Sequence, residues 1–253
     1  MEFGEIAVVW AVAFATSILS AVVGMAGGMT LLAAMLVLMP PLVAIPLHGL
    51  IQLASNGSRS VIQRKHARFD IVGRYALLLL PAGILGIWVA QGLPESAIRM
   101  AIGVFVLFAT WMPTALLLGT HPETSDSHRR FVVLGGVTGF LGVTLGATGP
   151  LIAPFFLNLG LTRQALVGTK AACQALGHLA KIVIYGGIGF AFLDHVPLLA
   201  GSIVAVIAGT WVGSRVLDRV SERAFVALYK GVLTVLALRL VLNELPFLLG
   251  ASA

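Results

Sequence analysis

The chain has 253 residues, of which 58% are hydrophobic and only 10% are charged. A soluble globule of this length could not bury so much apolar side chain, so the composition excludes that class and is typical of a polytopic membrane protein. The formal net charge of +6 does not indicate nucleic-acid binding, because the basic residues lie between apolar runs and form no patch interleaved with aromatic side chains.

The apolar runs are too long for the strands of a membrane barrel and show no alternation. Helices therefore remain as the spanning element, because every backbone polar group must be satisfied inside a bilayer. We predict an all-α polytopic integral membrane protein. The single cysteine, Cys173, excludes a disulfide framework and a cysteine metal site, and we expect no cofactor.

The first half of the chain predicts five helical segments. Residues 6–23 form a first helix, which we expect to be retained because it lacks the basic start of a secretory leader. A short helix at 30–39 follows a glycine cluster at 24–28 and stops at Pro40 and Pro41. A long helix from residue 42 leads to a basic loop at 64–68, and the last two spans are expected at 75–89 and 97–118.

The polar segment 119–130 is the predicted boundary between a first repeat at 1–118 and a second repeat at 131–253. The second half predicts the same series of segments. These are 131–145, 151–159, 162–185, 196–212 and 224–242.

The two halves share a set of residues at one constant spacing, which indicates an internal duplication. Each member of the second set lies 122 positions after its counterpart in the first. The first set is Gly24, Gly27, His48, Gln52, Asn56 and Arg59, and the second is Gly146, Gly149, Lys170, Gln174, His178 and Lys181.

Corresponding loops of the two halves differ in charge. The loop after the long helix is rich in arginine and lysine in the first half but carries Asp194 in the second, and the pattern reverses in the next loop. Because cytoplasmic loops collect positive charge, corresponding loops should lie on opposite sides. We therefore predict inverted repeats of about five helices each, including the short glycine-led broken helix, with a cytoplasmic linker at 119–130 and both termini outside. The alternative is two parallel repeats of four helices each.

Polar residues on the long helices recur at spacings of three and four, which places them on one face. Such groups are costly in lipid and normally face a bundle interior or a water-filled cavity. A helix that begins inside the membrane at a glycine adds free N–H groups and the positive end of its dipole. The predicted substrate-binding residues are Gly27, Gly28, Thr30, His48, Gln52, Asn56, Thr148, Gly149, Lys170, Gln174 and His178, with Arg59 and Lys181 as further candidates.

Each of these features has an alternative interpretation. Glycines at such spacings are often close-packing contacts, and a buried amide often forms an interhelical hydrogen bond. Arg59 could extend to the inner surface instead of the site.

The distribution of charge favours an anionic substrate. All ten carboxylates lie in predicted loops or at helix ends, whereas Lys170 and Lys181 lie within a predicted membrane helix. A buried cation without a counter-charge is costly, and a bound anion is the simplest partner.

The glycine-led short helix, the sequence Ala165-Leu166-Val167-Gly168-Thr169-Lys170 and the duplication resemble the TauE/SafE family of sulfite and sulfonate exporters. The resemblance covers essentially the whole chain and implies export of a small sulfur-containing anion across the inner (plasma) membrane by alternating access about a central cationic site. The chain departs from the family pattern at His48-Gly49-Leu50, where a Gly-Thr-Ser-like sequence is expected.

Two other function classes were compared with this hypothesis. A gated anion channel would use the same cationic site and is the alternative function. An intramembrane enzyme is disfavoured, because paired membrane aspartates, a His-Glu-x-x-His helix and a Gly-x-Ser-x-Gly elbow are all missing. Protons are a conceivable further partner through His48 and His178, and the oligomeric state stays open.

Overall fold

The computed structural model describes residues 2–23, 27–112, 115, 127–156, 159, 161–216 and 222–248, and the regular elements in these ranges are helices. The first half contains α1 (Phe3–Val23), α2 (Gly27–Leu38), α3 (Pro41–Ile62), α4 (Phe69–Ala76), α5 (Leu79–Gly92) and α6 (Glu95–Trp111). The second half contains α7 (Ser127–Thr144), α8 (Gly149–Phe156), α9 (Arg163–Gly187), the short 3-10 helix η2 (Phe192–His195), α10 (Val196–Val216) and α11 (Glu222–Leu248). The all-helical prediction is confirmed.

Two predicted spans differ from the observed helices. The span expected at 75–89 begins earlier, at Phe69, and is interrupted at Leu77 and Leu78 between α4 and α5. The span expected at 97–118 ends at Trp111. Residues 24–26 of the glycine cluster and residues 119–126 of the expected linker lie outside the described ranges, and α7 begins at Ser127, inside that linker.

The short helices α2 and α8 begin at the glycines that the sequence singled out. An arginine from another helix donates to carbonyl groups near the end of each. Arg99 of α6 donates to the carbonyl oxygens of Leu36 and Met39 at the end of α2. Arg130 of α7 donates to the carbonyl oxygen of Phe155 in α8, with 3.3 Å between the atoms. A cation is favourable there because the last carbonyls of a helix lack partners and carry its negative dipole end.

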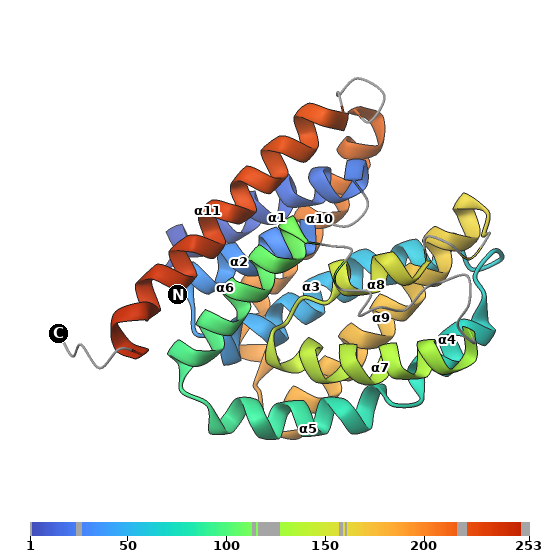
Figure 1. The fold of residues 1–253 in the computed structure, drawn as a ribbon. Coiled ribbons are helices and arrows are strands. Elements are labelled where there is room, and N and C mark those ends of the chain that lie inside the picture. The colour runs from blue at the N-terminus through green and yellow to red at the C-terminus, as the bar shows by residue number, and fades with distance from the viewer. Residues whose placement is uncertain are drawn as a thin grey trace.

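Helices α3 and α9 pack against each other in opposite directions near the middle of the molecule (Figure 1). The start of α3 meets the end of α9, since the rings of His48 and His178 are neighbours, whereas Gly168 at the start of α9 lies against Gln63 just after α3. Helices α6 and α11 also run in opposite directions. Arg99 pairs with Glu244 at 3.6 Å near one end of that pair, and Trp111 donates to Thr234 at the other.

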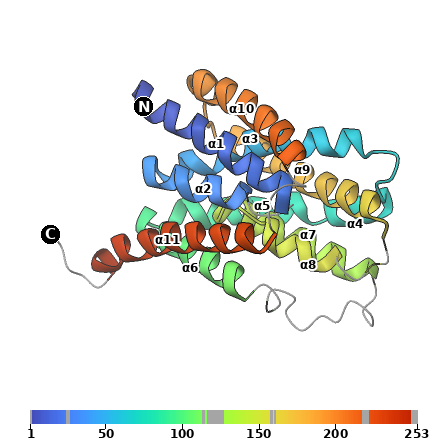
Figure 2. The same cartoon turned by 90° about the horizontal axis from the view of Figure 1, so that it is seen from above.

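Two other major pairs run in the same direction. Helix α1 packs on α10, with Trp10 donating to the carbonyl oxygen of Leu198 and Phe14 lying against Gly209 further along both helices. Helix α7 packs on α4 and α5, and Gly135 and Gly139 of α7 face Tyr75 and Leu79 in the same order. Figures 1 and 2 show the same arrangement from two directions.

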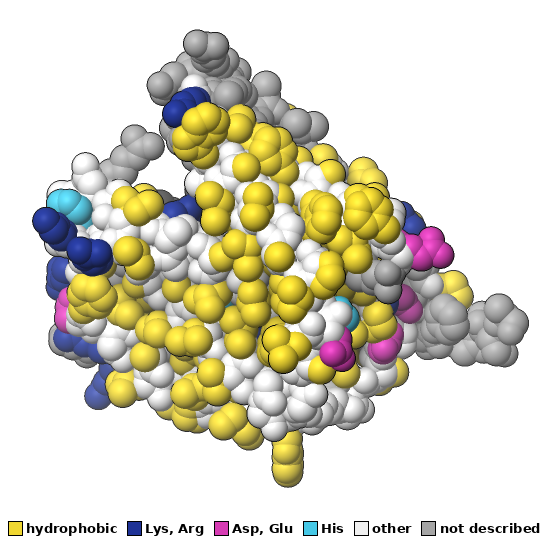
Figure 3. Space-filling model, turned by 180° about the vertical axis from the view of Figure 1, so that it is seen from behind, with side chains coloured by type: hydrophobic (Ala, Val, Ile, Leu, Met, Phe, Trp, Pro, Cys, Tyr) yellow, Lys and Arg dark blue, Asp and Glu magenta, His cyan; other side chains and the backbone are white. Residues whose placement is uncertain are grey.

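The outer surface is apolar over a wide area. Hydrophobic side chains cover the centre of the face in Figure 3, with Lys and Arg gathered mainly along one edge and Asp and Glu near the opposite edge. Large side chains such as Trp88, Val204 and Val235 are exposed. The segments Phe69–Gly92 and Phe192–Gly213 are each long and apolar enough to cross a membrane. A surface of this kind suits lipid contact.

Candidate functional site

A small cavity lies where the crossing of α3 and α9 meets the first residues of α2 and α8. The volume that the centre of a water molecule can reach is about 30 Å³. This is room on the order of a few water molecules or one compact ion. The lining residues are Ser20, Gly28, Met29, His48, Gln52, Asn56, Arg59, Ala147, Thr148, Gly149, Pro150, Gln174 and His178.

Helix α3 supplies four polar side chains to one wall of the cavity, spaced as the helical repeat requires. The Nε2 atom of His48 lies 2.8 Å from the carbonyl oxygen of Gly28. Because a carbonyl only accepts, Nε2 carries the hydrogen, and this bond ties α3 to the start of α2. At the other end of the stripe, Arg59 donates to the hydroxyl of Ser20 in α1, with 3.4 Å between the atoms.

Helix α9 supplies the opposite wall through Gln174 and His178. The imidazole of His178 meets that of His48 edge to face, with ring centroids 5.9 Å apart and planes at 80°. Thr162, just before the helix, caps its start, because its side chain accepts a hydrogen bond from the backbone N–H of Ala165.

The beginnings of α2 and α8 complete the cavity. Gly28 and Gly149 belong to the first turns of these helices, where backbone N–H groups have no intrahelical partner and the positive dipole end lies. A Cβ atom on Gly28 would lie 3.2 Å from the amide of Gln52, so the glycine keeps this part of the cavity open. Two helix starts therefore present donors to one space.

Four predicted site residues do not line the cavity. Gly27 packs against α1, where a Cβ atom would lie 2.0 Å from the carbonyl oxygen of Thr16, and Thr30 is buried within α2. Lys170 lies half-buried on α9, within electrostatic range of Arg59. Lys181 is 2% exposed, and its ammonium donates to the carbonyl oxygen of Gly146 at 2.6 Å.

The position of Lys181 has a local cause. A Cβ atom on Gly49 would lie 2.8 Å from Cδ of Lys181, so the glycine on α3 leaves the space through which the lysine stem passes. Gly146, with φ of +82°, ends the turn after α7 and turns its carbonyl toward that ammonium. Lys181 thus joins α9 to the break between α7 and α8.

The sequence analysis did not select Ser20, Met29, Ala147 or Pro150 as site residues. Ser20 had a usable signal, because it is a polar residue of an apolar helix one turn before the glycine cluster. Met29, Ala147 and Pro150 adjoin selected residues in the chain, but no chemical property marked them.

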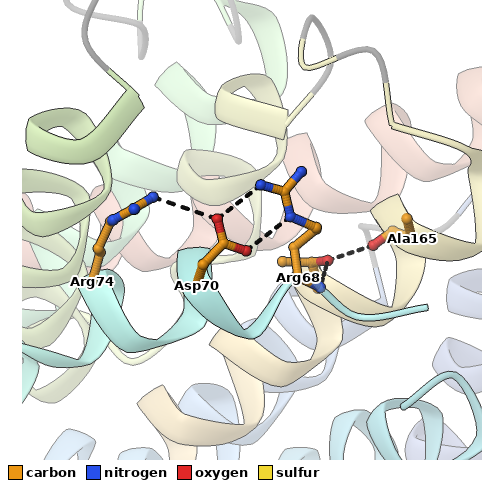
Figure 4. A network of polar contacts seen from close by, with 5 residues as sticks. Arg68, Asp70, Arg74 and Ala165 are labelled. Atoms are coloured by element: carbon orange, nitrogen blue, oxygen red, sulfur yellow. Dashed lines mark hydrogen bonds and ion pairs between the residues drawn. The ribbon is translucent and has the colours of Figure 1, made fainter. Parts of the chain in front are cut away.

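The described residues that line the cavity include no carboxylate. Asp70 lies instead at the molecular surface, where it pairs with Arg68 at 2.8 Å and Arg74 at 3.5 Å (Figure 4). The backbone N–H of Arg68 donates to Thr169, whose hydroxyl donates in turn to the carbonyl oxygen of Ala165. These contacts attach the basic loop after α3 to the start of α9.

The cavity offers amide, hydroxyl, imidazole and guanidinium groups together with helix N-termini, a donor-rich and positively charged set that suits a small anion. No group of three His, Cys, Asp or Glu side chains that could hold a metal ion occurs in the part of the chain that the structure describes.

The sequence model of a protein family described as "Sulfite exporter TauE/SafE" matches residues 9–240. No curated protein and no solved structure matches the chain.

Proposed function

Because this chain belongs to the sulfite exporter TauE/SafE family, and is therefore a membrane transporter for sulfur-containing anions and not an enzyme, we propose that it exports sulfite, a sulfonate or a related small anion across the inner membrane. The observation that carries this proposal is the cavity between the two long helices. Its wall combines Arg59 and two helix N-termini with neutral donors, and no carboxylate of the described residues faces it.

Export of an anion through this site agrees with the membrane potential. With the cell interior negative, moving one negative charge outward is favoured by about 2.3 kcal/mol per 100 mV. The protein therefore has no thermodynamic need of a sodium gradient for outward transport.

The helix directions support an inverted relation between the repeats 1–118 and 131–253. Under the 122-residue spacing α3 corresponds to α9, and α6 corresponds in order to α11, and both of these pairs run in opposite directions. The contact of α1 with α10 corresponds to the contact of α7 with α4 and α5, and within each contact the helices run in the same direction. Two parallel repeats of four helices each would require corresponding helices to run in the same direction. In the inverted arrangement, the linker 119–130 is cytoplasmic and both termini are outside.

In this proposal the anion binds to Gln52, Asn56, Gln174, His178, Thr148 and Arg59, with the backbone N–H groups at Gly28 and Gly149. His48 holds the start of α2 in place. Lys170 is a predicted contact on the cytoplasmic approach to Arg59, and Lys181 supports the site through Gly146. Rocking of the repeats about this position would expose it to each side in turn.

The test is sulfite efflux from proteoliposomes that contain the purified protein. We expect Gln174→Ala and Gln52→Ala each to lower the initial rate by tenfold or more, because each removes a hydrogen-bond donor from the anion. The matched control is Gln91→Ala, at an exposed position at the end of α5, which should transport at the wild-type rate. Wild-type efflux from both cavity variants would contradict the proposed site.

The same preparation separates a transporter from a gated anion channel. A transporter shows a rate that saturates with sulfite concentration and accelerates exchange when sulfite is present on both sides. A rate that rises in proportion to concentration, without exchange, would replace the transporter by the channel.

A further inference from the structure

The imidazole of His178 lines the cavity without a hydrogen-bond partner in the described part of the chain. The side chain is 8% exposed, and its Nδ1 atom is buried and unpartnered. The described residues also form no hydrogen bond with its Nε2 atom. A buried polar group of this kind normally has a partner, so its position in the wall indicates a ligand.

The groups around His178 are basic or neutral. Lys181 lies one turn further along α9 and acts electrostatically on both imidazoles, His48 adjoins the ring from α3, and Arg59 lines the same cavity. Helices α2 and α8, which close the cavity, have no titratable side chain. An added proton on His178 would therefore meet positive neighbours and no described carboxylate.

We propose that His178 takes up a proton when the anion binds, so that one proton moves through the protein with each anion. This inference rests on the proposed function of the cavity. The anion supplies the negative charge that the protonated ring requires, and the ring N–H supplies a charge-assisted hydrogen bond to the anion. Because binding free energies are coupled reciprocally, the anion strengthens proton binding as much as the proton strengthens anion binding.

His48 is less suited to this role. Its Nε2–H already donates to Gly28, so the ring is fixed in a contact that positions α2. The two repeats also differ at this point, since Asn56 occupies the position in α3 that corresponds to His178 in α9. One repeat thus contributes a group that can be charged and the other a neutral amide.

For a doubly charged anion, movement of one proton still leaves export favoured by the membrane potential. A doubly charged anion that travels with one proton carries one net negative charge, which the membrane potential drives outward by about 2.3 kcal/mol per 100 mV. The proton enters from water on the loading side and leaves to water on the releasing side, and no covalent bond of the anion changes.

The experiment counts protons taken up as the purified full-length protein binds an anion. Sodium methanesulfonate and sodium sulfite are titrated by calorimetry at one pH in two buffers with different heats of ionisation, and the difference in measured heat gives the protons bound per anion. Methanesulfonate is fully ionised in neutral water, so any proton that it brings in is bound by the protein. Sulfite itself also takes up protons near neutral pH. For sulfite, the proton uptake of the protein is therefore read as the difference between the wild type and the variant.

For the wild type we expect an uptake close to one proton per anion, together with an affinity that rises about tenfold for each unit of falling pH over the range in which empty His178 is neutral. His178→Asn, which places the residue of the first repeat here, should lower the uptake by one proton for either anion and weaken binding. His66→Gln, in the exposed loop after α3, should behave as the wild type.

Each result bears on one proposal. Anion binding by the wild type without proton uptake and without pH dependence would overturn the role of His178 and leave the anion site intact. An unchanged uptake in a folded His178→Asn variant would do the same. A wild type that binds neither anion would refute the proposed function and this inference with it.

Discussion

Gly27 and Gly28 are adjacent in the chain but meet different surroundings. Gly27 faces the backbone of α1 at Thr16, which cannot yield, whereas Gly28 faces the movable end of Gln52 across the cavity. One glycine thus permits helices to pack, and the other shapes the space between them.

This difference predicts opposite phenotypes for two alanine variants. Gly27→Ala should lower the free energy of unfolding by about 1 to 3 kcal/mol, because the added methyl group overlaps a backbone oxygen. Gly28→Ala should fold as the wild type but bind sulfite several-fold more weakly, because the methyl group displaces Gln52. Thermal unfolding and sulfite binding in detergent measure the two effects. Equal loss of stability in both variants would show that Gly28 is also a packing residue.

Much of the cavity wall could be anticipated from single residues. The three- and four-residue spacing placed His48, Gln52, Asn56 and Arg59 together because a helix of known period leaves no other arrangement. Lys181 satisfies the same spacing, yet its side chain turns away to Gly146, a contact that depends on the space over Gly49. Which way a long side chain extends is decided by neighbouring helices and not by its own helix.

At the scale of the elements, the contact of α7 with α4 and α5 depends on close backbone approach. A Cβ atom on Gly135 would lie 1.9 Å from the carbonyl oxygen of Tyr75, and one on Gly139 would lie 2.3 Å from that of Leu79. The hydroxyl of Thr138 also donates to that of Tyr75 at 2.7 Å. Small residues are how membrane helices gain packing and interhelical hydrogen bonds without a hydrophobic driving force.

Gly135→Ala should therefore destabilise the protein, by about 1 to 3 kcal/mol, through overlap with a backbone oxygen. The matched control is Gly136→Ala, where the new Cβ would lie 3.4 Å from Cβ of Leu78, an ordinary contact. Its unfolding temperature should stay the same or rise, since alanine favours a helix over glycine. The comparison is made by thermal unfolding in detergent, and a stable Gly135→Ala variant would contradict the packing role.

Several helix ends and one helix break have a signal in the sequence. Helix α3 begins at Pro41 because a proline suits the first turn of a helix, and α2 and α8 begin at Gly27 and Gly149. Pro81 marks the interruption at Leu77 and Leu78, because a proline cannot donate to the carbonyl four residues before it, here that of Leu77. The break also lies next to Tyr75, where the backbone of α7 comes close at Gly135.

For the whole molecule, the proposed inversion of the repeats predicts on which side each loop lies. On the face shown in Figure 3, most basic side chains lie near one edge and most acidic ones nearer the opposite edge, with an apolar centre between them. This pattern agrees with the preference of cytoplasmic loops for positive charge. Charge placement could anticipate this separation because it acts on whole loops and does not depend on atomic contacts.

Single cysteines test the sidedness directly. In a Cys173→Ala background, which removes a buried thiol, Lys65→Cys and Asp194→Cys should react with a membrane-impermeant maleimide from opposite faces of the membrane. Both positions are exposed in the structure. Labelling of both from the same face would exclude the inverted topology and favour two parallel repeats of four helices each.

Arg59 and Lys181 occupy corresponding positions, and each reaches toward the end of the first helix of its own half. The bond of Lys181 to Gly146 is short, at 2.6 Å, whereas that of Arg59 to Ser20 is long, at 3.4 Å. The two contacts also differ in kind, because Lys181 donates to a backbone carbonyl and Arg59 to a side-chain hydroxyl. If the two halves exchange conformations when the cavity opens to the other side, the contact of Arg59 should shorten in that state and the contact of Lys181 should lengthen.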